Sequence, residues 1–191
     1  MRKVFIIHQW GGNSKEDFVP WLADNLRQKG WNVETPNMPE TEAPTIENWV
    51  GHLRKIAKDA DSETFFIAHS IGAQAVLRFL EGFDRPVGGG LFIAGWITVS
   101  GLDEEGWTIA RPWLDTPINL EKVRSVLTRS VAIFSDNDPY IPFEANKEAF
   151  QKELGSKIVI LSGAGHITGD DGYTTIPEAL EEFELMTKDH D

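Results

Sequence analysis

Residues 64–72 have the sequence TFFIAHSIG, in which an apolar run leads directly to His69 and Ser70. Such a run predicts a buried strand, and the small residues Ala68 and Gly72 allow the backbone to turn sharply into a helix. A serine on this turn stands at the carboxyl end of its strand, and the N–H groups of the next helix point toward it. Ser70 is therefore a candidate nucleophile, and the alternative is a serine that only caps the helix.

Apolar runs alternate with segments of helical period on both sides of this stretch. This alternation predicts a three-layer α/β fold with a mostly parallel sheet of about six strands. Right-handed connections and a central nucleophile strand give the strand order 2-1-3-4-5-6, with ligands above the carboxyl ends of the first and third strands. We expect strands at residues 3–8, 31–36, 64–69, 88–96, 129–135 and 157–161, and helices at 17–29, 45–56, 73–81, 143–154 and 175–186, with a short helix after Asn119.

Residues 98–117 have neither a strand period nor a helix period. The segment contains Gly101, Gly106, Pro112 and Pro117, which interrupt regular structure. We therefore expect an ordered surface excursion that roofs the site, rather than a strand or a helix. No shift in composition marks a boundary elsewhere, so we expect one domain that spans residues 1–191.

The composition excludes several classes of function. The chain has 191 residues, no Cys and a formal net charge of -12. Without Cys there is no disulfide framework, thiolate zinc site or cysteine nucleophile. The negative charge opposes binding to nucleic acid and to anionic membrane surfaces. The apolar run at residues 4–7 is too short for a signal peptide or a membrane span, so we expect a cytoplasmic protein.

A serine nucleophile needs a base, a carboxylate that orients the base, and donors for an oxyanion. His166 follows the sixth expected strand in the sequence GAGH, and Asp138 follows the fifth in the sequence SDNDPYIP. The chain order Ser, Asp, His is that of the α/β-hydrolases. Asp136 is an alternative to Asp138, because Asp also favours turns. His8 and His69 are expected to form hydrogen bonds that orient their surroundings.

These motifs resemble the retinoblastoma-binding serine hydrolase family, a group of small α/β-hydrolases that includes compact bacterial esterase-like members. The resemblance covers essentially the whole chain and implies a Ser70, Asp138, His166 triad and no large cap domain. It also implies an oxyanion hole made by the backbone N–H groups of Ile71 and Trp10. The matching pieces are Gly11-Gly12, Asn37-Met38-Pro39, the serine turn, Arg111-Pro112-Trp113, Asp138-Pro139-Tyr140-Ile141-Pro142 and Gly165-His166.

The chain also departs from the family pattern. Ala68 stands where many relatives have Gly, and Gln9 replaces the Gly of a His-Gly pair, so Gln9 and Trp10 are both candidates for the second oxyanion donor. Binding to the retinoblastoma protein requires a Cys in the family's animal namesake. This chain has no Cys, so that partner is not carried over, and a protein partner remains open.

The resulting hypothesis is a serine hydrolase that cleaves a small carboxylic ester or related acyl compound through an acyl-enzyme, without a cofactor. The alternatives are an amidase or thioesterase with the same triad, or a non-catalytic protein-binding module on the same fold. Zinc binding is disfavoured, because His8, His69, His166 and Asp170 lack a metal-site spacing. Two sets of residues are expected around the substrate: pocket residues His8, Gln9, Trp107, Trp113, Tyr140 and Ile141, and the acidic rim residues Asp136, Glu144, Asp170 and Asp171, which favour neutral or cationic substrates.

Overall fold

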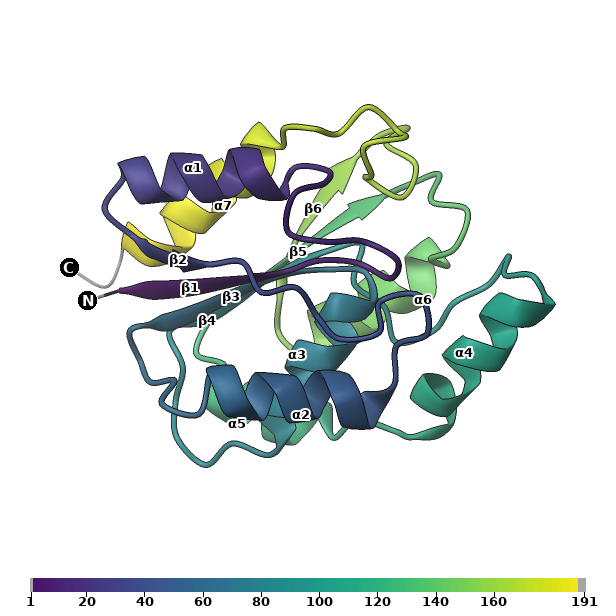
Figure 1. Cartoon of the computed structure of the whole chain (residues 1–191), viewed down its shortest axis with the longest axis horizontal. Helices are drawn as coiled ribbons and strands as arrows, with labels where there is room; N and C mark the ends of the chain where they lie inside the picture. The colour runs from purple at the N-terminus through teal and green to yellow at the C-terminus, as the bar shows by residue number, and fades with distance from the viewer. Residues whose placement is uncertain (1, 189–191) are drawn as a thin grey trace.

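The computed structural model describes residues 2–188, which form a six-stranded parallel sheet (Figure 1). The strand order is β2-β1-β3-β4-β5-β6, as predicted. The central strand β3 is buried over its whole length, as expected for a parallel sheet with both faces covered. The strands are β1 (Lys3–Ile7), β2 (Asn32–Glu34), β3 (Thr64–His69), β4 (Gly89–Ile93), β5 (Ser130–Ser135) and β6 (Lys157–Leu161).

Helices cover both faces of the sheet. In Figure 1, α1 and α7 lie on one face, and α2, α3 and α5 lie on the other. Side chains cap two of these helices: the Thr45 side chain accepts a hydrogen bond from the Asn48 N–H and the Asn119 side chain accepts one from the Lys122 N–H. The helices are α1 (Val19–Gln28), α2 (Ile46–Ile56), α3 (Ile71–Glu81), α4 (Glu104–Asp115), α5 (Leu120–Val126), α6 (Phe143–Glu148), the π-helical turn η1 (Ala149–Glu153) and α7 (Pro177–Lys188).

The end of β4 and the helix expected at 143–154 differ from the sequence predictions for clear backbone reasons. β4 ends at Ile93 instead of residue 96, because Ala94 has a φ of 45° and leaves the extended conformation. The single helix expected at 143–154 is divided into α6 and η1, where the hydrogen bonding changes to the wider π pattern.

The prediction that residues 98–117 contain no helix is wrong, because the segment includes α4. Asp103 begins this helix: its carboxylate accepts a hydrogen bond from the Gly106 N–H at 2.8 Å. Glu104 and Glu105 lie in the first turn, where negative charge interacts favourably with the helix dipole. These capping signals were present in the sequence but were outweighed by the glycines and prolines around them.

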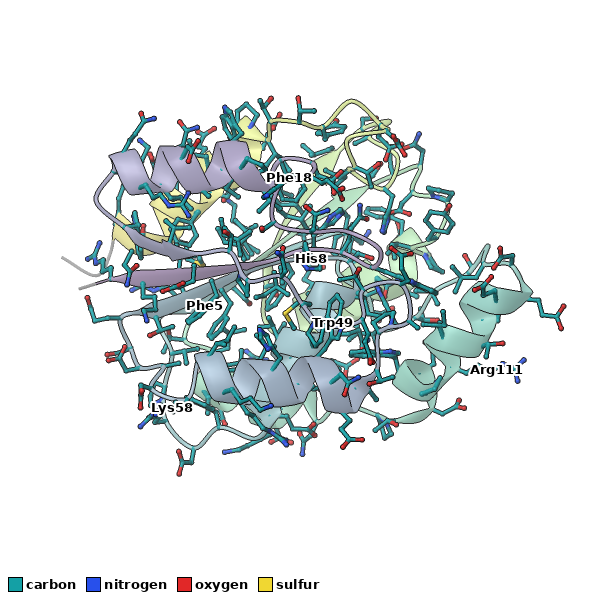
Figure 2. All side chains as sticks on the ribbon, in the orientation of Figure 1. Phe5, His8, Phe18, Trp49, Lys58 and Arg111 are labelled. Carbon is teal, nitrogen blue, oxygen red and sulfur yellow. The ribbon has the colours of Figure 1, made fainter. Side chains whose placement is uncertain are left out.

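The buried face of α4 explains why its period was missed. Gly106, Ala110 and Trp113 are buried at helical spacing, but two of the three are too small to give a clear hydrophobic period. Pro112 lies near the carboxyl end of the helix, so it removes one hydrogen bond and leaves the earlier turns intact. On the opposite side, Arg111 projects away from the rest of the molecule (Figure 2). The segment is thus a short helix with one buried face, whose Trp113 contacts Trp49 of α2 and Arg78 of α3.

Candidate active site

Ser70 occupies a strained turn between β3 and α3. Its φ is 52° and its ψ is -120°, a conformation that residues with a Cβ rarely adopt. A Cβ at Gly72 would lie 2.7 Å from the backbone oxygen of His8, so this position requires glycine for the start of α3 to pack against the end of β1. The Ser70 side chain forms no capping hydrogen bond with α3. The Ser70 side chain therefore does not act as a helix cap.

Three predicted side chains form a continuous hydrogen-bonded chain. The His166 Nε2 lies 2.9 Å from the Ser70 Oγ, and the His166 Nδ1 lies 2.7 Å from the Asp138 Oδ2. The other oxygen of Asp138 accepts hydrogen bonds from the N–H groups of Tyr140 and Ile141. The side chains of Asp138 and His166 are 1% and 11% exposed. An Nδ1–H that donates to the carboxylate leaves the Nε2 lone pair free to accept the serine proton.

Asp136, the alternative carboxylate, has a different set of partners. Its oxygens accept hydrogen bonds from the Ser162 hydroxyl at 2.7 Å and from the Gly163 N–H at 2.8 Å. The Gly163 N–H, followed by the Ser162 hydroxyl, lowers the pKa of Asp136. Asp136 therefore holds the loop after β6 that leads to His166, while Asp138 contacts the imidazole itself.

Asp171 holds the same loop on its other side, a role that was not predicted. One of its oxygens accepts hydrogen bonds from the N–H groups of His166 and Thr168 and from the Thr168 hydroxyl. Partial burial acts to raise the pKa of Asp171, but the hydrogen bonds from Thr168 and His166 together lower it. A Cβ at Gly165 would overlap this carboxylate, which explains the glycine before the histidine. No local sequence pattern identifies such a contact within a loop.

His69 contacts both the backbone and the ring of His166. Its Nε2 donates a hydrogen bond to the His166 backbone oxygen at 3.0 Å, and the two rings lie 5.4 Å apart between centroids. The expected hydrogen-bonding role is confirmed, and the residue is fully buried. Burial, and secondarily repulsion from the His166 ring, lower the pKa of His69 from 6.5 to about 3. His69 is therefore neutral in the native protein at neutral pH.

Replacing His69 with Gln should reduce the loss of stability in acid. The unfolded chain binds a proton at His69 below about pH 6.5, whereas the native chain binds it only near pH 3. The free energy of unfolding should thus fall, as the pH drops from 6.5 toward 3, by on the order of 1 kcal/mol per pH unit from this residue. Gln can retain the donor to His166 without titrating. Denaturant unfolding of the two proteins at several pH values measures the difference.

The surface histidine His52 provides a matched control. It is only partly buried on α2, so His52→Gln should leave most of the acid dependence in place. A difference in unfolding free energy between the wild type and His69→Gln that stays constant from pH 7 to the acid range would contradict the prediction.

The candidate oxyanion donors face the same space as Ser70. Ile71 is the first residue of α3, and Trp10 lies in the loop after β1. Gly11 and Gly12 use their N–H groups for hydrogen bonds to the backbone oxygens of Thr41 and Gln9. Within residues 2–188, the N–H groups of Ile71, Trp10 and the alternative donor Gln9 have no hydrogen-bond acceptor. All three groups are thus available to a ligand.

A cavity of about 550 Å³ opens beside Ser70 and His166. Of the predicted pocket residues, Gln9, Tyr140 and Ile141 line it, together with Ser70 and both candidate oxyanion residues. The segment at residues 98–117 lies over the site, as expected, but the residues through which α4 and the segment after β4 line the cavity were not predicted. The further lining residues are Glu42, Trp96, Val99, Gly101, Leu102, Asp103, Glu105, Gly106, Ile109 and Ala110.

Three predicted pocket residues do not line the cavity. His8 is buried, and its Nε2 accepts a hydrogen bond from the Met38 N–H, so its Nδ1–H donates to the Gln9 backbone oxygen. Burial lowers the pKa of His8, and its ring packs edge-on against Trp49, near the centre of Figure 2. Trp113 is also buried, with its indole N–H donating to the Pro44 backbone oxygen. Trp107 packs against the hydrophobic core.

The acidic residues at the cavity are also different from those predicted. Glu42, Asp103 and Glu105 line it, whereas Asp136, Glu144, Asp170 and Asp171 do not. The sequence-based placement failed because α4, which brings Glu105 to the site, was not predicted. Among residues 2–188, no group of three His, Asp or Glu side chains is arranged to hold a metal ion. No helix in that same range is long and apolar enough to cross a membrane.

Comparisons with known proteins agree with this architecture. The profile of the family described as serine hydrolase matches residues 4–184. The Bacillus subtilis protein YdeN is 27% identical over 182 residues, which cover 92% of this chain and 91% of YdeN. The serine hydrolase RBBP9 of Rattus norvegicus is 24% identical over 162 residues, which cover 83% of this chain and 78% of RBBP9.

Solved structures show the same fold. The crystal structure of YdeN has a TM-score of 0.89 and 24% identity, and the match covers 97% of this chain and 98% of that one. Est1E from Butyrivibrio proteoclasticus with bound ferulic acid has a TM-score of 0.72 and 16% identity, covering 98% of this chain and 89% of that one. From the family match over nearly its whole length and the shared fold, the chain belongs to the serine hydrolase family and is a compact α/β-hydrolase.

Proposed function

We propose that this hydrolase cleaves small carboxylic esters through an acyl-enzyme formed on Ser70, with His166 as general base and acid and Asp138 as the group that orients it. One observation carries the proposal: the Asp138–His166–Ser70 hydrogen bonds, at 2.7 and 2.9 Å, end at a hydroxyl that borders a cavity of about 550 Å³. A general base must lie within hydrogen-bond reach of the proton it removes, and these distances satisfy that requirement.

Acylation begins when the Ser70 Oγ attacks the ester carbonyl carbon while its proton passes to the His166 Nε2. The carbonyl oxygen becomes an oxyanion, which accepts hydrogen bonds from the N–H groups of Ile71 and Trp10. Asp138 stabilises the imidazolium through the Nδ1–H. When the tetrahedral intermediate collapses, the carbon–oxygen bond to the alcohol breaks and the Nε2–H gives its proton to the departing alcohol oxygen.

Deacylation repeats these steps with water. The His166 Nε2 takes a proton from a water molecule as its oxygen attacks the acyl carbon, and the second tetrahedral intermediate meets the same two N–H groups. Its collapse breaks the bond to the Ser70 Oγ, which recovers its proton from the imidazolium. The products are the alcohol and the carboxylic acid, and the enzyme returns to its starting state without any cofactor.

The cavity supports a small substrate. Its volume of about 550 Å³ falls within the range of roughly 300 to 1,000 Å³ that is typical for small-molecule sites. Val99, Ile109 and Ile141 supply apolar surface for an acyl or alcohol group. The Est1E structure contains ferulic acid, which is a small carboxylic acid, bound to a protein of the same fold.

Activity-based labelling tests the proposal. A fluorophosphonate probe should modify Ser70, as located by mass spectrometry of the digested protein, and nitrophenyl esters from acetate to octanoate should be hydrolysed with a preference for short acyl chains. Matched anilide and thioester substrates test the amidase and thioesterase alternatives. A folded protein that neither reacts with the probe nor hydrolyses any of these compounds would instead be a non-catalytic module.

A further inference from the structure

Asp17 connects two loops that come from opposite ends of the sequence. One of its carboxylate oxygens accepts a hydrogen bond from the Gln9 side-chain amide at 2.9 Å, and the other accepts one from the Gly169 N–H at 2.7 Å. Gln9 precedes Trp10 in the loop that carries the proposed oxyanion donor. Gly169 lies three residues after His166, in the loop that carries the proposed base. The carboxylate therefore joins the two halves of the proposed catalytic machinery.

The backbone at Asp17 is held in an unfavourable conformation. Its φ is 52°, in the left-handed region that glycine adopts readily and that Asp and Asn tolerate better than most other residues. A Cβ at Gly169 would lie 3.1 Å from the Asp17 Oδ1, so a larger residue there would require this carboxylate to shift by a few tenths of an ångström. A strained backbone is retained where its surroundings fix it, and such positions cluster at functional sites.

The other anchors of the oxyanion loop lead elsewhere. The His8 ring connects the Gln9 backbone oxygen to the Met38 N–H, and the Trp10 indole N–H donates to the Glu42 backbone oxygen. Both contacts tie the loop to the segment at residues 36–45. Among the residues that the structure describes, the Gln9–Asp17–Gly169 contact is the hydrogen-bonded route from this loop to the histidine loop.

We propose that Asp17 is a positioning residue, which fixes the oxyanion donor of Trp10 relative to His166 by holding Gln9 and Gly169 on one carboxylate. This inference rests on the proposed function. It also gives a role to the Gln9 side chain, which tethers its loop to the Asp17 carboxylate. Asp17 acts through its neighbours and does not line the cavity.

Asp17→Gly is the decisive variant, because glycine accepts the left-handed backbone and removes only the carboxylate. We expect kcat for ester hydrolysis to fall by roughly ten- to hundred-fold through misplacement of the oxyanion donor, with KM little changed. The thermal midpoint of unfolding should not decrease. Affinity for a boronic acid, whose tetrahedral serine adduct places an oxygen in the oxyanion site, should weaken in parallel with kcat.

Two further variants test whether a loss of kcat comes from the broken hydrogen bonds, from the lost negative charge or from general disruption of the loop. Asp17→Asn tolerates the same backbone, keeps an oxygen for Gly169 and can bond Gln9 once that amide rotates, so it should restore most of kcat. Asp170→Ala removes an exposed carboxylate from the residue next to Gly169 and should leave kcat and KM unchanged. If Asp17→Asn is as slow as Asp17→Gly, or if Asp170→Ala is equally slow, the tether is not the cause.

A double-mutant cycle tests whether Asp17 affects kcat through its hydrogen bond with Gln9. Gln9→Ala and Asp17→Gly break the same contact, so the double variant should be no slower than the slower single variant. Losses that multiply, or an Asp17→Gly enzyme with unchanged kcat and boronic acid affinity, would overturn the inference. Failure of the proposed function has a different signature, because the wild type itself would then bind no boronic acid and label no serine.

Discussion

Replacing Ser70 with Ala should lower kcat for ester hydrolysis by about 10⁴- to 10⁶-fold, because no acyl-enzyme can form and the rest of the triad has nothing to activate. Only the residual effects of binding and oxyanion stabilisation would remain. Steady-state assays with the best nitrophenyl ester, at enzyme concentrations high enough to measure the residual rate, provide the test. Fluorophosphonate labelling should disappear in the same variant.

The controls for this experiment use other features of the chain. Ser125 is exposed on α5, where its hydroxyl donates to the Lys122 backbone oxygen, so Ser125→Ala should retain full activity. Ser70→Gly removes the hydroxyl, so it should be inactive. Because glycine also relieves the backbone strain at a φ of 52°, the free energy of unfolding of this variant should be no lower than that of the wild type. A folded Ser70→Ala protein that hydrolyses esters at the wild-type rate would refute the acyl-enzyme.

Replacing Asp138 with Asn should lower kcat by on the order of 10³- to 10⁴-fold. The geometry explains why the change is severe. The Asp138 Oδ1 is fixed by the N–H groups of Tyr140 and Ile141, so in the variant the new amide group points at the His166 Nδ1. An amide N–H there selects the tautomer with the proton on Nε2, and that tautomer cannot accept the proton of Ser70. KM should change little, because Asp138 does not line the cavity.

Asp136→Asn is the matched control for this prediction. It makes the same chemical change two residues away, on a carboxylate that binds Ser162 and Gly163. We expect at most a small loss of kcat. If Asp136→Asn lost as much activity as Asp138→Asn, or if Asp138→Asn kept the wild-type rate, the assignment of the orienting carboxylate would be wrong.

The arrangement of Ser70, Asp138 and His166 could be predicted because it depends on few and strong signals. The ends of parallel strands lie along one edge of the sheet, so residues that follow the third, fifth and sixth strands are brought near one another by topology alone. The apolar run at residues 64–67 and the small residues around Ser70 identified the turn. The choice of Asp138 over Asp136 rested on position in the loop, and the structure brings Asp138, not Asp136, to the imidazole.

The walls of the cavity could not be predicted in this way. Gly106 and Ala110 have side chains too small to show a helical period, so α4 and the lining residues on it were missed. Trp113 is a large aromatic residue and was assigned to the pocket, but its indole N–H finds an acceptor at Pro44, 69 positions earlier in the chain. The contacts of Asp17 and Asp171 with backbone N–H groups in loops leave no pattern in the sequence.

The position of α4 has a consequence for how such enzymes diversify. Ser70, Asp138 and His166 follow β3, β5 and β6, whereas Gly106, Ile109 and Ala110 belong to a short insertion between β4 and α5. The α4 wall of the cavity is thus encoded apart from Ser70, Asp138 and His166, although other lining residues lie close to these three in the sequence. Exchanging the 12 residues of α4 would reshape this one wall and leave the proposed catalytic residues in place, which makes the helix a natural target for recombination and directed evolution.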